Sequence, residues 1–271
     1  MTATLRDAVS PDLRATLRAL KLGQMLATLP DRLTLARQQK MTHADFLELV
    51  LADEVTRREA KSASLRARAA GLDPGMRLDT WDPTAAVRYD HQLWNELTSL
   101  RFLDGPHGAV ILGPVGVGKT HLASALGHIA IRRRRTVHMA SAAKLFKRLK
   151  AARLDNTLDY EIRRLATVEL LILDDYALQP LGPTETTDFY ELCVERHQRA
   201  PTVVTSNRTP EEWLSMMADP LLAQSAVDRL VSTAHELIID GESYRRRQKP
   251  SIRNTSSMSV DDEKEDHDDH S

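Results

Sequence analysis

Residues 113–120 read GPVGVGKT and fit the pattern G-x-x-x-x-G-K-[S/T]. Glycines in such a loop let the backbone turn tightly enough for successive N–H groups to face phosphate oxygens. The apolar run AVIL at 109–112 leads into the loop as a strand pattern, and HLASALGHIAI at 121–131 leads out of it as a helical pattern. We therefore expect a nucleotide pocket formed by Gly113, Pro114, Val115, Gly116, Val117, Gly118, Lys119, Thr120 and His121.

A triphosphate in this pocket needs cationic partners and a metal. We expect Lys119 to reach the terminal phosphates and the Thr120 hydroxyl to ligate Mg²⁺. The buried-strand pattern VELLILDD at 168–175 ends in Asp174 and Asp175, and parallel strands present their last residues beside the phosphate loop. Asp174 is expected to hold Mg²⁺, and Asp175 to orient or deprotonate the attacking water. Proteins of this architecture mostly carry glutamate at the second position, so the shorter Asp175 leaves the rate of hydrolysis open.

A third apolar run, PTVVTSN at 201–207, also ends in a polar residue. The Asn207 amide can contact both the terminal phosphate and the attacking water, or Asn207 can be a simple turn residue. The order of strand followed by polar side chain repeats that of Asp174, which favours the first interpretation.

The rest of the chain alternates between helical and strand patterns. Helices are expected at 84–101, 119–134, from 142 onward and at 184–197; strands at 109–112, 136–140, 170–174, 202–206 and 236–240. This alternation predicts an α/β fold in which a mostly parallel sheet lies between two layers of helices. Before it, residues 1–74 predict a small all-helical domain, with a break near Pro30 and a long helix that begins at Thr42, with Asp45 placed for a capping contact, and ends at Gly71.

The domain boundaries follow from composition. Gly, Pro and Asp concentrate in GLDPGMRLDTWDP at 71–83, which predicts a linker before an α/β nucleotide-binding domain at 75–250. The segment 251–271 ends in DDEKEDHDDHS, which holds seven carboxylates, so we expect a disordered acidic tail. No membrane span or secretory signal is evident, and the chain is expected in the cytoplasm. The single cysteine, Cys193, is expected to fill the core.

Basic residues cluster in patterns that suit a nucleic acid backbone. Lys144, Lys147, Arg148 and Lys150 fall within two turns of one expected helix, and Arg57 and Arg58 lie in the basic half of the long N-terminal helix. Either group can instead be an ordinary solvated face, as can RRRR at 132–135. Aromatic residues make up only 4% of the chain, too few for an evident base-stacking platform, so double-stranded DNA is the favoured partner.

The combination of GPVGVGKT, LLILDDYA, VVTSNRTPEEW, AVDRL and IIDGESYRRR resembles the IstB-like ATPases of bacterial insertion sequences, which are related to DnaC helicase loaders and DnaA initiators within the AAA+ class. The resemblance implies a P-loop AAA+ domain with a five-stranded sheet, binding ATP with Mg²⁺. It also implies that Asn207 is the sensor-1 residue, that Arg229 is an arginine finger acting on a neighbouring subunit, and that Arg245 lies near the sensor-2 position, although Arg246 and Arg247 adjoin it. Without the resemblance, an ion pair of Arg229 with Asp228 or Glu236 is the simpler expectation.

These features predict an AAA+ ATPase stimulated by oligomerisation and DNA. We expect a homo-oligomer that assembles on duplex target DNA, bends it and presents it to a transposase. The transposase partner is inferred from the resemblance alone, because the residue patterns by themselves indicate only an oligomeric ATPase that binds DNA. Two alternatives stay open: a DnaC-like helicase loader that prefers single strands, and an ATP-dependent DNA scaffold with negligible hydrolysis.

Overall fold

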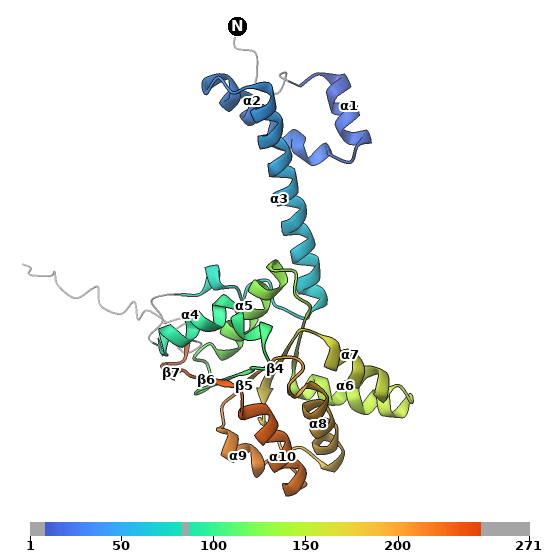
Figure 1. The fold of residues 1–271 in the computed structure, drawn as a ribbon, viewed down its shortest axis with the longest axis vertical. Coiled ribbons are helices and arrows are strands. Elements are labelled where there is room, and N and C mark those ends of the chain that lie inside the picture. Colours follow the sequence, from blue (N-terminus) through green and yellow to red (C-terminus); the bar gives the residue numbers. More distant parts are fainter. Residues whose placement is uncertain (1–8, 83–86, 245–271) are drawn as a thin grey trace, which may run out of the picture.

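The computed structural model describes residues 9–82 and 87–244 of the chain. An α/β domain carries a long helix, α3 (His43–Ala69), which projects away from the sheet and holds α1 and α2 at its far end (Figure 1). The small N-terminal region consists of α1 (Pro11–Ala19), η2 (Gly23–Ala27), α2 (Leu29–Gln38) and the first half of α3. Its core is formed by Val9, Leu17, Met25, Leu29 and Val50.

Local capping explains where these helices begin. Ser10 accepts a hydrogen bond from the Leu13 N–H at the start of α1. Thr42 and Asp45 form a reciprocal capping box at the start of α3, as the sequence predicts, because each side chain satisfies a backbone N–H that the helix leaves open. The second predicted feature, the break near Pro30, is the start of α2.

The last turn of α3 and the residues directly after it pack against the α/β domain. Ala67, Ala70 and Leu72 lie in the same apolar cluster as residues of the sheet and of α5. The Met139 N–H donates to the Ala70 carbonyl oxygen at 2.7 Å. Gly71 has φ +83°, and a Cβ there would lie 2.4 Å from the Met139 carbonyl oxygen, so glycine is required where α3 meets the sheet.

Five strands form one parallel sheet: β2 (Ala109–Leu112), β3 (Val137–Ser141), β4 (Leu170–Tyr176), β5 (Thr202–Ser206) and β6 (His235–Ile238). Their order is β3-β4-β5-β2-β6, and every paired neighbour in this sheet is parallel. The predicted fold class, a five-stranded mostly parallel sheet between helices preceded by a helical region, is confirmed. This order places the carboxyl ends of β4, β5 and β2 side by side.

Two apolar clusters cover the two faces of the sheet. Ile111, Ile172 and Val203 point into one cluster, shared with α4 (His91–Ser99), η4 (Arg101–Asp104) and α5 (Lys119–Arg132). Val110, Leu173 and Val204 point into the other, which is covered by α6 (Ala142–Leu154), α7 (Leu158–Thr167), α8 (Pro183–Arg196), α9 (Pro210–Leu214) and α10 (Pro220–Val231). The alternation along each strand explains why central strands are apolar throughout.

The helix predicted over 84–101 is wrong in its first part. Residues 87–88 form a short strand, β1, which pairs antiparallel with β7 (Asp240–Gly241), and α4 begins only at His91 because Asp90 accepts hydrogen bonds from the N–H groups of Gln92 and Leu93. Residues 83–86 and the predicted acidic tail at 251–271 lie outside the described residues. None of the described helices is long and apolar enough to cross a membrane.

Candidate functional site

The carboxyl ends of β2, β4 and β5 surround one cavity of about 560 Å³. This volume falls within the range of about 300–1,000 Å³ that is usual for small-molecule sites. The lining residues come from the phosphate loop, from the ends of β4 and β5, from the segment before α4 and from the segment after β7. They include Val115, Gly116, Val117, Gly118, Lys119, Thr120, His121, Asp175, Asn207, Trp81 and Tyr244. The structure therefore brings the predicted phosphate loop, Asp175 and Asn207 together.

The loop has the backbone form that phosphate binding requires. Gly113, Gly116 and Gly118 have φ values of +151°, +88° and +99°, which side-chain-bearing residues rarely adopt. A Cβ at Gly113 would lie 2.1 Å from the Ile239 carbonyl oxygen. The Lys119 side chain is buried, and its Nζ donates to the carbonyl oxygens of Gly113 and Pro114 at 2.8 and 2.7 Å. The ammonium group therefore lies inside the loop, where terminal phosphates would bind.

A bulge in β4 positions the two aspartates. The register pairs Leu173 with Val204 but Tyr176 with Ser206, so β4 has one extra residue opposite β5. Asp175 has φ +53° and is exposed to the cavity, whereas Asp174 is 8% exposed. Aspartate adopts this left-handed region more readily than most side chains, so it suits this position of the bulge.

The surroundings of Asp174 suit a magnesium ligand. Burial raises the pKa of the Asp174 carboxyl, and hydrogen bonds from the Thr205 and Thr120 hydroxyls oppose this rise while the nearby Asp175 adds to it. The Thr205 Oγ1 donates to Asp174 Oδ1 at 2.6 Å. Two neighbouring carboxylates and the Thr120 hydroxyl are the oxygen donors that Mg²⁺ prefers, so these residues fit the metal that nucleotide triphosphates carry.

Two parts of the site were missed by the sequence-based reasoning. Trp81 lies against the loop, since a Cβ at Gly118 would be 2.6 Å from its indole ring, and its ring centroid is 5.2 Å from that of His121. The His121 Nε2 donates to the Arg77 carbonyl oxygen at 2.8 Å. The predicted linker thus forms a wall of the cavity. Its glycine- and proline-rich composition is typical of a linker and gave no sign of contact with a ligand site. The other missed residue is Thr205, which a strand pattern marks only as a strand residue.

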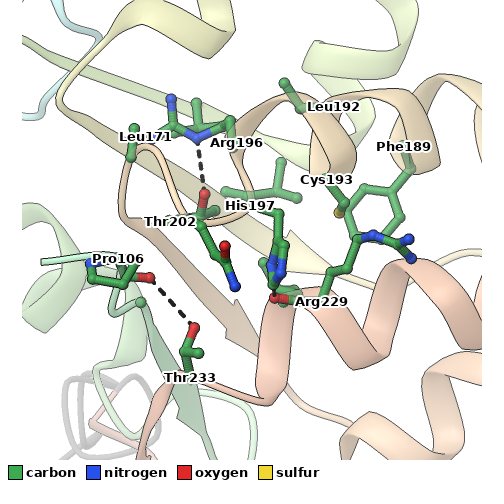
Figure 2. Close-up of a pocket in the computed structure, with 15 residues that line it drawn as sticks. Pro106, Leu171, Phe189, Leu192, Cys193, Arg196, His197, Thr202, Arg229 and Thr233 are labelled. Carbon is green, nitrogen blue, oxygen red and sulfur yellow. Dashed lines mark hydrogen bonds between the residues drawn. The ribbon is translucent and has the colours of Figure 1, made fainter.

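Arg229 lies away from this cavity. It lines a second, small cavity of about 30 Å³ together with residues at the amino-terminal ends of the strands, such as Gly108 and Thr202 (Figure 2). Its Nη1 donates to the Ser225 carbonyl oxygen at 2.8 Å, and its guanidinium carbon lies 5.7 Å from the centroid of the Tyr190 ring. Arg229 makes these contacts instead of the ion pair with Asp228 or Glu236 that was the simpler expectation. Arg245 lies outside the described residues.

The predicted DNA-contacting residues fall into two groups. Lys144, Lys147 and Lys150 are exposed on α6 and have no ion-pair partner among residues 9–82 and 87–244, while Leu145, Phe146 and Leu149 seat the helix on the core. The arginines, by contrast, have partners within the chain. Arg148 pairs with Glu161 at 2.9 Å, Arg57 and Arg58 pair with Glu54 at 2.7 Å, Arg134 pairs with Glu59 at 2.8 Å, and Arg135 pairs with Glu169 at 2.9 Å.

Solved structures show a similar fold. The DnaC helicase loader aligns with a TM-score of 0.53 at 19% identity, covering 61% of this chain and 97% of that one. The DnaI structure aligns with a TM-score of 0.51 at 21% identity, covering 60% of this chain and 90% of that one. At this level of identity the likeness concerns the fold alone.

Sequence relatives come from bacterial insertion sequences. An insertion-sequence ATP-binding protein of Mycobacterium tuberculosis is 37% identical over 241 residues, which span 89% of this chain and 96% of the relative. An ATP-binding protein of the insertion sequence IS21 from Pseudomonas aeruginosa is 30% identical over 255 residues, spanning 93% and 96%. The family model described as IstB-like ATP binding protein matches residues 15–251, and the chain therefore belongs to the IstB-like ATP-binding family.

Proposed function

We propose that this chain is an ATP-dependent, self-assembling ATPase that binds and bends duplex target DNA and presents it to a transposase. One observation carries the proposal. The carboxyl ends of three strands converge on a cavity that contains the phosphate loop and the polar residues Asp175 and Asn207, whereas Arg229 lies outside that cavity. A site built in this way binds nucleotide by itself, and no arginine lines it among the described residues, so a neighbouring copy can supply one.

The residues of the cavity divide the work of ATP binding and hydrolysis. Thr120 and Asp174 would hold Mg²⁺, which neutralises phosphate charge when it is bound. Lys119 exchanges its carbonyl partners for the terminal phosphates, and the Asn207 amide donates to the transferred phosphoryl group. Asp175, exposed to the cavity, orients the attacking water and accepts its proton. Arg245, near the sensor-2 position, is proposed to assist at the same phosphates.

Assembly completes the site in this proposal. Phosphoryl transfer spreads negative charge over the transferred group, and a guanidinium stabilises that charge. Since Arg229 does not line the nucleotide cavity of its own chain, it can reach a phosphate only across an interface with a second copy. Turnover therefore depends on oligomerisation.

The exposed lysines of α6 form the proposed contact with the DNA backbone. Lys144, Lys147 and Lys150 have no ion-pair partner within the described parts of the chain, so their charges are available to phosphates. Arg148 is a weaker candidate, because Glu161 already neutralises it. The same holds for Arg57 and Arg58, which share Glu54. Contacts of this kind are indifferent to base sequence and weaken as salt displaces them.

Reversing the charge at Lys147 tests this surface. Lys147→Glu is expected to weaken duplex binding about equally for unrelated sequences and to lower the slope of log affinity against log salt by about one. Fluorescence anisotropy with two labelled duplexes across a salt series measures both quantities. Arg148→Gln is expected to have a smaller effect on affinity, because its charge is already paired.

Lys40→Glu is the matched control, since it makes the same charge change at an exposed position remote from α6. An equal loss of affinity in the control would mean that net charge, and not the α6 surface, governs binding. A loss confined to one duplex sequence would contradict backbone recognition.

The partner can be tested with purified proteins. With ATP and duplex DNA, the chain is expected to form oligomers, measured by light scattering, and to retain a partner transposase on the same DNA. A helicase loader, the alternative that the fold likeness allows, would instead retain the replicative helicase and prefer single strands. Equal duplex binding by single copies without ATP would overturn the proposal.

A further inference from the structure

Thr205 connects the two strands that carry the catalytic groups. It lies in β5, two residues before Asn207, and its side chain is fully buried. Its hydroxyl donates to Asp174 Oδ1 at 2.6 Å and accepts from the Asp175 backbone N–H at 3.0 Å. One hydroxyl therefore contacts both aspartates of β4.

The bulge explains why a hydroxyl is needed at this position. With one extra residue between Leu173 and Tyr176, the backbone N–H of Asp175 does not continue the ladder of hydrogen bonds to β5. A buried N–H without a partner is costly, and the Thr205 Oγ1 supplies the acceptor. The left-handed conformation of Asp175, φ +53°, is thereby held by a side chain of the neighbouring strand.

The next residue closes the bulge on its other side. The Ser206 Oγ donates to the Tyr176 carbonyl oxygen at 2.8 Å and accepts from Trp213 Nε1 at 3.0 Å. Asp175 and Tyr176 are thus tied to β5 by the consecutive hydroxyl groups of Thr205 and Ser206. Ser206, however, contacts neither aspartate side chain in these bonds, which leaves Thr205 as the link to the carboxylates.

We infer that Thr205 is a positioning residue of the ATPase: its hydroxyl aims the Asp174 carboxylate at Mg²⁺ and holds the Asp175 backbone so that its carboxylate faces the water. The inference rests on the proposed hydrolysis of ATP. Partners of metal ligands in this position commonly contribute about 10- to 100-fold in metal affinity or activity. Because Thr205 precedes Asn207 by two residues, the same hydroxyl fixes β5 and its sensor residue relative to β4.

The test compares variants that keep or remove the hydroxyl. Thr205→Val has nearly the same shape as threonine without the oxygen, and Thr205→Ser keeps the oxygen without the methyl group. Thr205→Val is expected to lower kcat about 10- to 100-fold and to raise the Mg²⁺ concentration at half-maximal turnover, with ATP affinity in the absence of Mg²⁺ changed by less than about threefold. Thr205→Ser is expected to restore both quantities to near the wild-type values.

Thr202→Val is the matched control. Thr202 is the first residue of the same strand, at the end opposite to Asn207, and its hydroxyl accepts from Arg196 Nε at 2.9 Å (Figure 2). A merely structural role for strand hydroxyls predicts that Thr202→Val and Thr205→Val lower thermal stability alike, with turnover per folded molecule unchanged. If Thr205→Val does not fold, Thr205→Ala removes the same hydrogen bonds with less apolar bulk and takes its place.

A second readout separates this inference from the proposed function. The gain in ATP affinity on adding Mg²⁺, measured by calorimetry, needs no hydrolysis and is expected to require a higher Mg²⁺ concentration in Thr205→Val. A wild-type chain that shows this gain but no turnover would overturn the proposed ATPase activity and leave the positioning role standing. Wild-type turnover and Mg²⁺ dependence in Thr205→Val, or failure of serine to rescue them, would overturn the positioning role.

Discussion

Replacing Lys119 with alanine is expected to weaken ATP binding by about 100-fold or more and to abolish ATP-dependent binding of duplex DNA. The Nζ lies within 2.8 Å of the Gly113 and Pro114 carbonyl oxygens, inside the phosphate loop. It is therefore placed to meet the charge of the terminal phosphates. Calorimetry measures the ATP affinity, and anisotropy of a labelled duplex measures the dependence on ATP.

Trp81 offers a direct optical readout of the same binding event. It is partly exposed and lines the cavity, whereas Trp94 and Trp213 are 5% and 0% exposed, so nucleotide should change the fluorescence of Trp81 in particular.

Lys61→Ala, at an exposed lysine of α3, is the matched control for Lys119→Ala and is expected to bind ATP normally. Thermal melting distinguishes lost binding from lost folding, since the variant leaves two carbonyl groups without the lysine. Wild-type duplex binding by Lys119→Ala would remove the phosphate loop from the DNA-binding mechanism.

Two of the three strands that border the nucleotide site were predicted from the sequence to the residue, and the third, β4, runs two residues beyond its predicted end at Asp174. Ala109–Leu112 and Thr202–Ser206 coincide with their predicted ranges, because a buried parallel strand is a short apolar run and both runs end in polar or glycine residues. The convergence of Lys119, Asp175 and Asn207 on one cavity follows from the same rule, since parallel strands present their carboxyl ends at one edge.

Features that depend on partners distant in sequence could not be predicted. The bulge at Asp174 and Asp175 is held by hydroxyls about 30 residues away, and no periodicity marks such a contact. The arginine clusters illustrate the same limit: basic residues predict a DNA surface, but Glu161 and Glu54 pair with Arg148 and with Arg57 and Arg58. Ion pairs between different helices and strands decide which basic side chains remain available to DNA, and these pairs cannot be predicted from composition.

Replacing Arg229 with alanine is expected to lower ATP turnover by about 10³- to 10⁵-fold in the assembled protein while ATP affinity stays near that of the wild type. Turnover and ATP affinity are expected to respond differently because Arg229 lines a cavity at the amino-terminal ends of the strands, whereas the nucleotide cavity lies at their carboxyl ends. Its removal therefore leaves the nucleotide pocket of its own chain intact. Steady-state phosphate release and calorimetry measure the two quantities.

Two controls distinguish a finger from a stabilising arginine. Arg229→Lys keeps a charge but lacks the planar fork, and a finger predicts that lysine restores little of the turnover. Arg199→Ala removes an exposed arginine that pairs with Glu195 at 2.9 Å, and it is expected to leave turnover unchanged. Since Arg229 also donates to Ser225 and lies over Tyr190, melting curves must show that Arg229→Ala remains folded.

Mixing two inactive variants tests whether the finger acts between copies. Asp175→Asn is expected to bind ATP without hydrolysing it and to keep an intact Arg229, while Arg229→Ala keeps an intact pocket. In an equal mixture, about one interface in four joins an intact pocket to an intact finger, because head-to-tail interfaces draw each part from a different subunit. Turnover should therefore reappear on mixing, at roughly a quarter of the wild-type rate or below. A finger acting within its own chain would leave the mixture inactive, and then Arg229 could not be what makes hydrolysis depend on assembly.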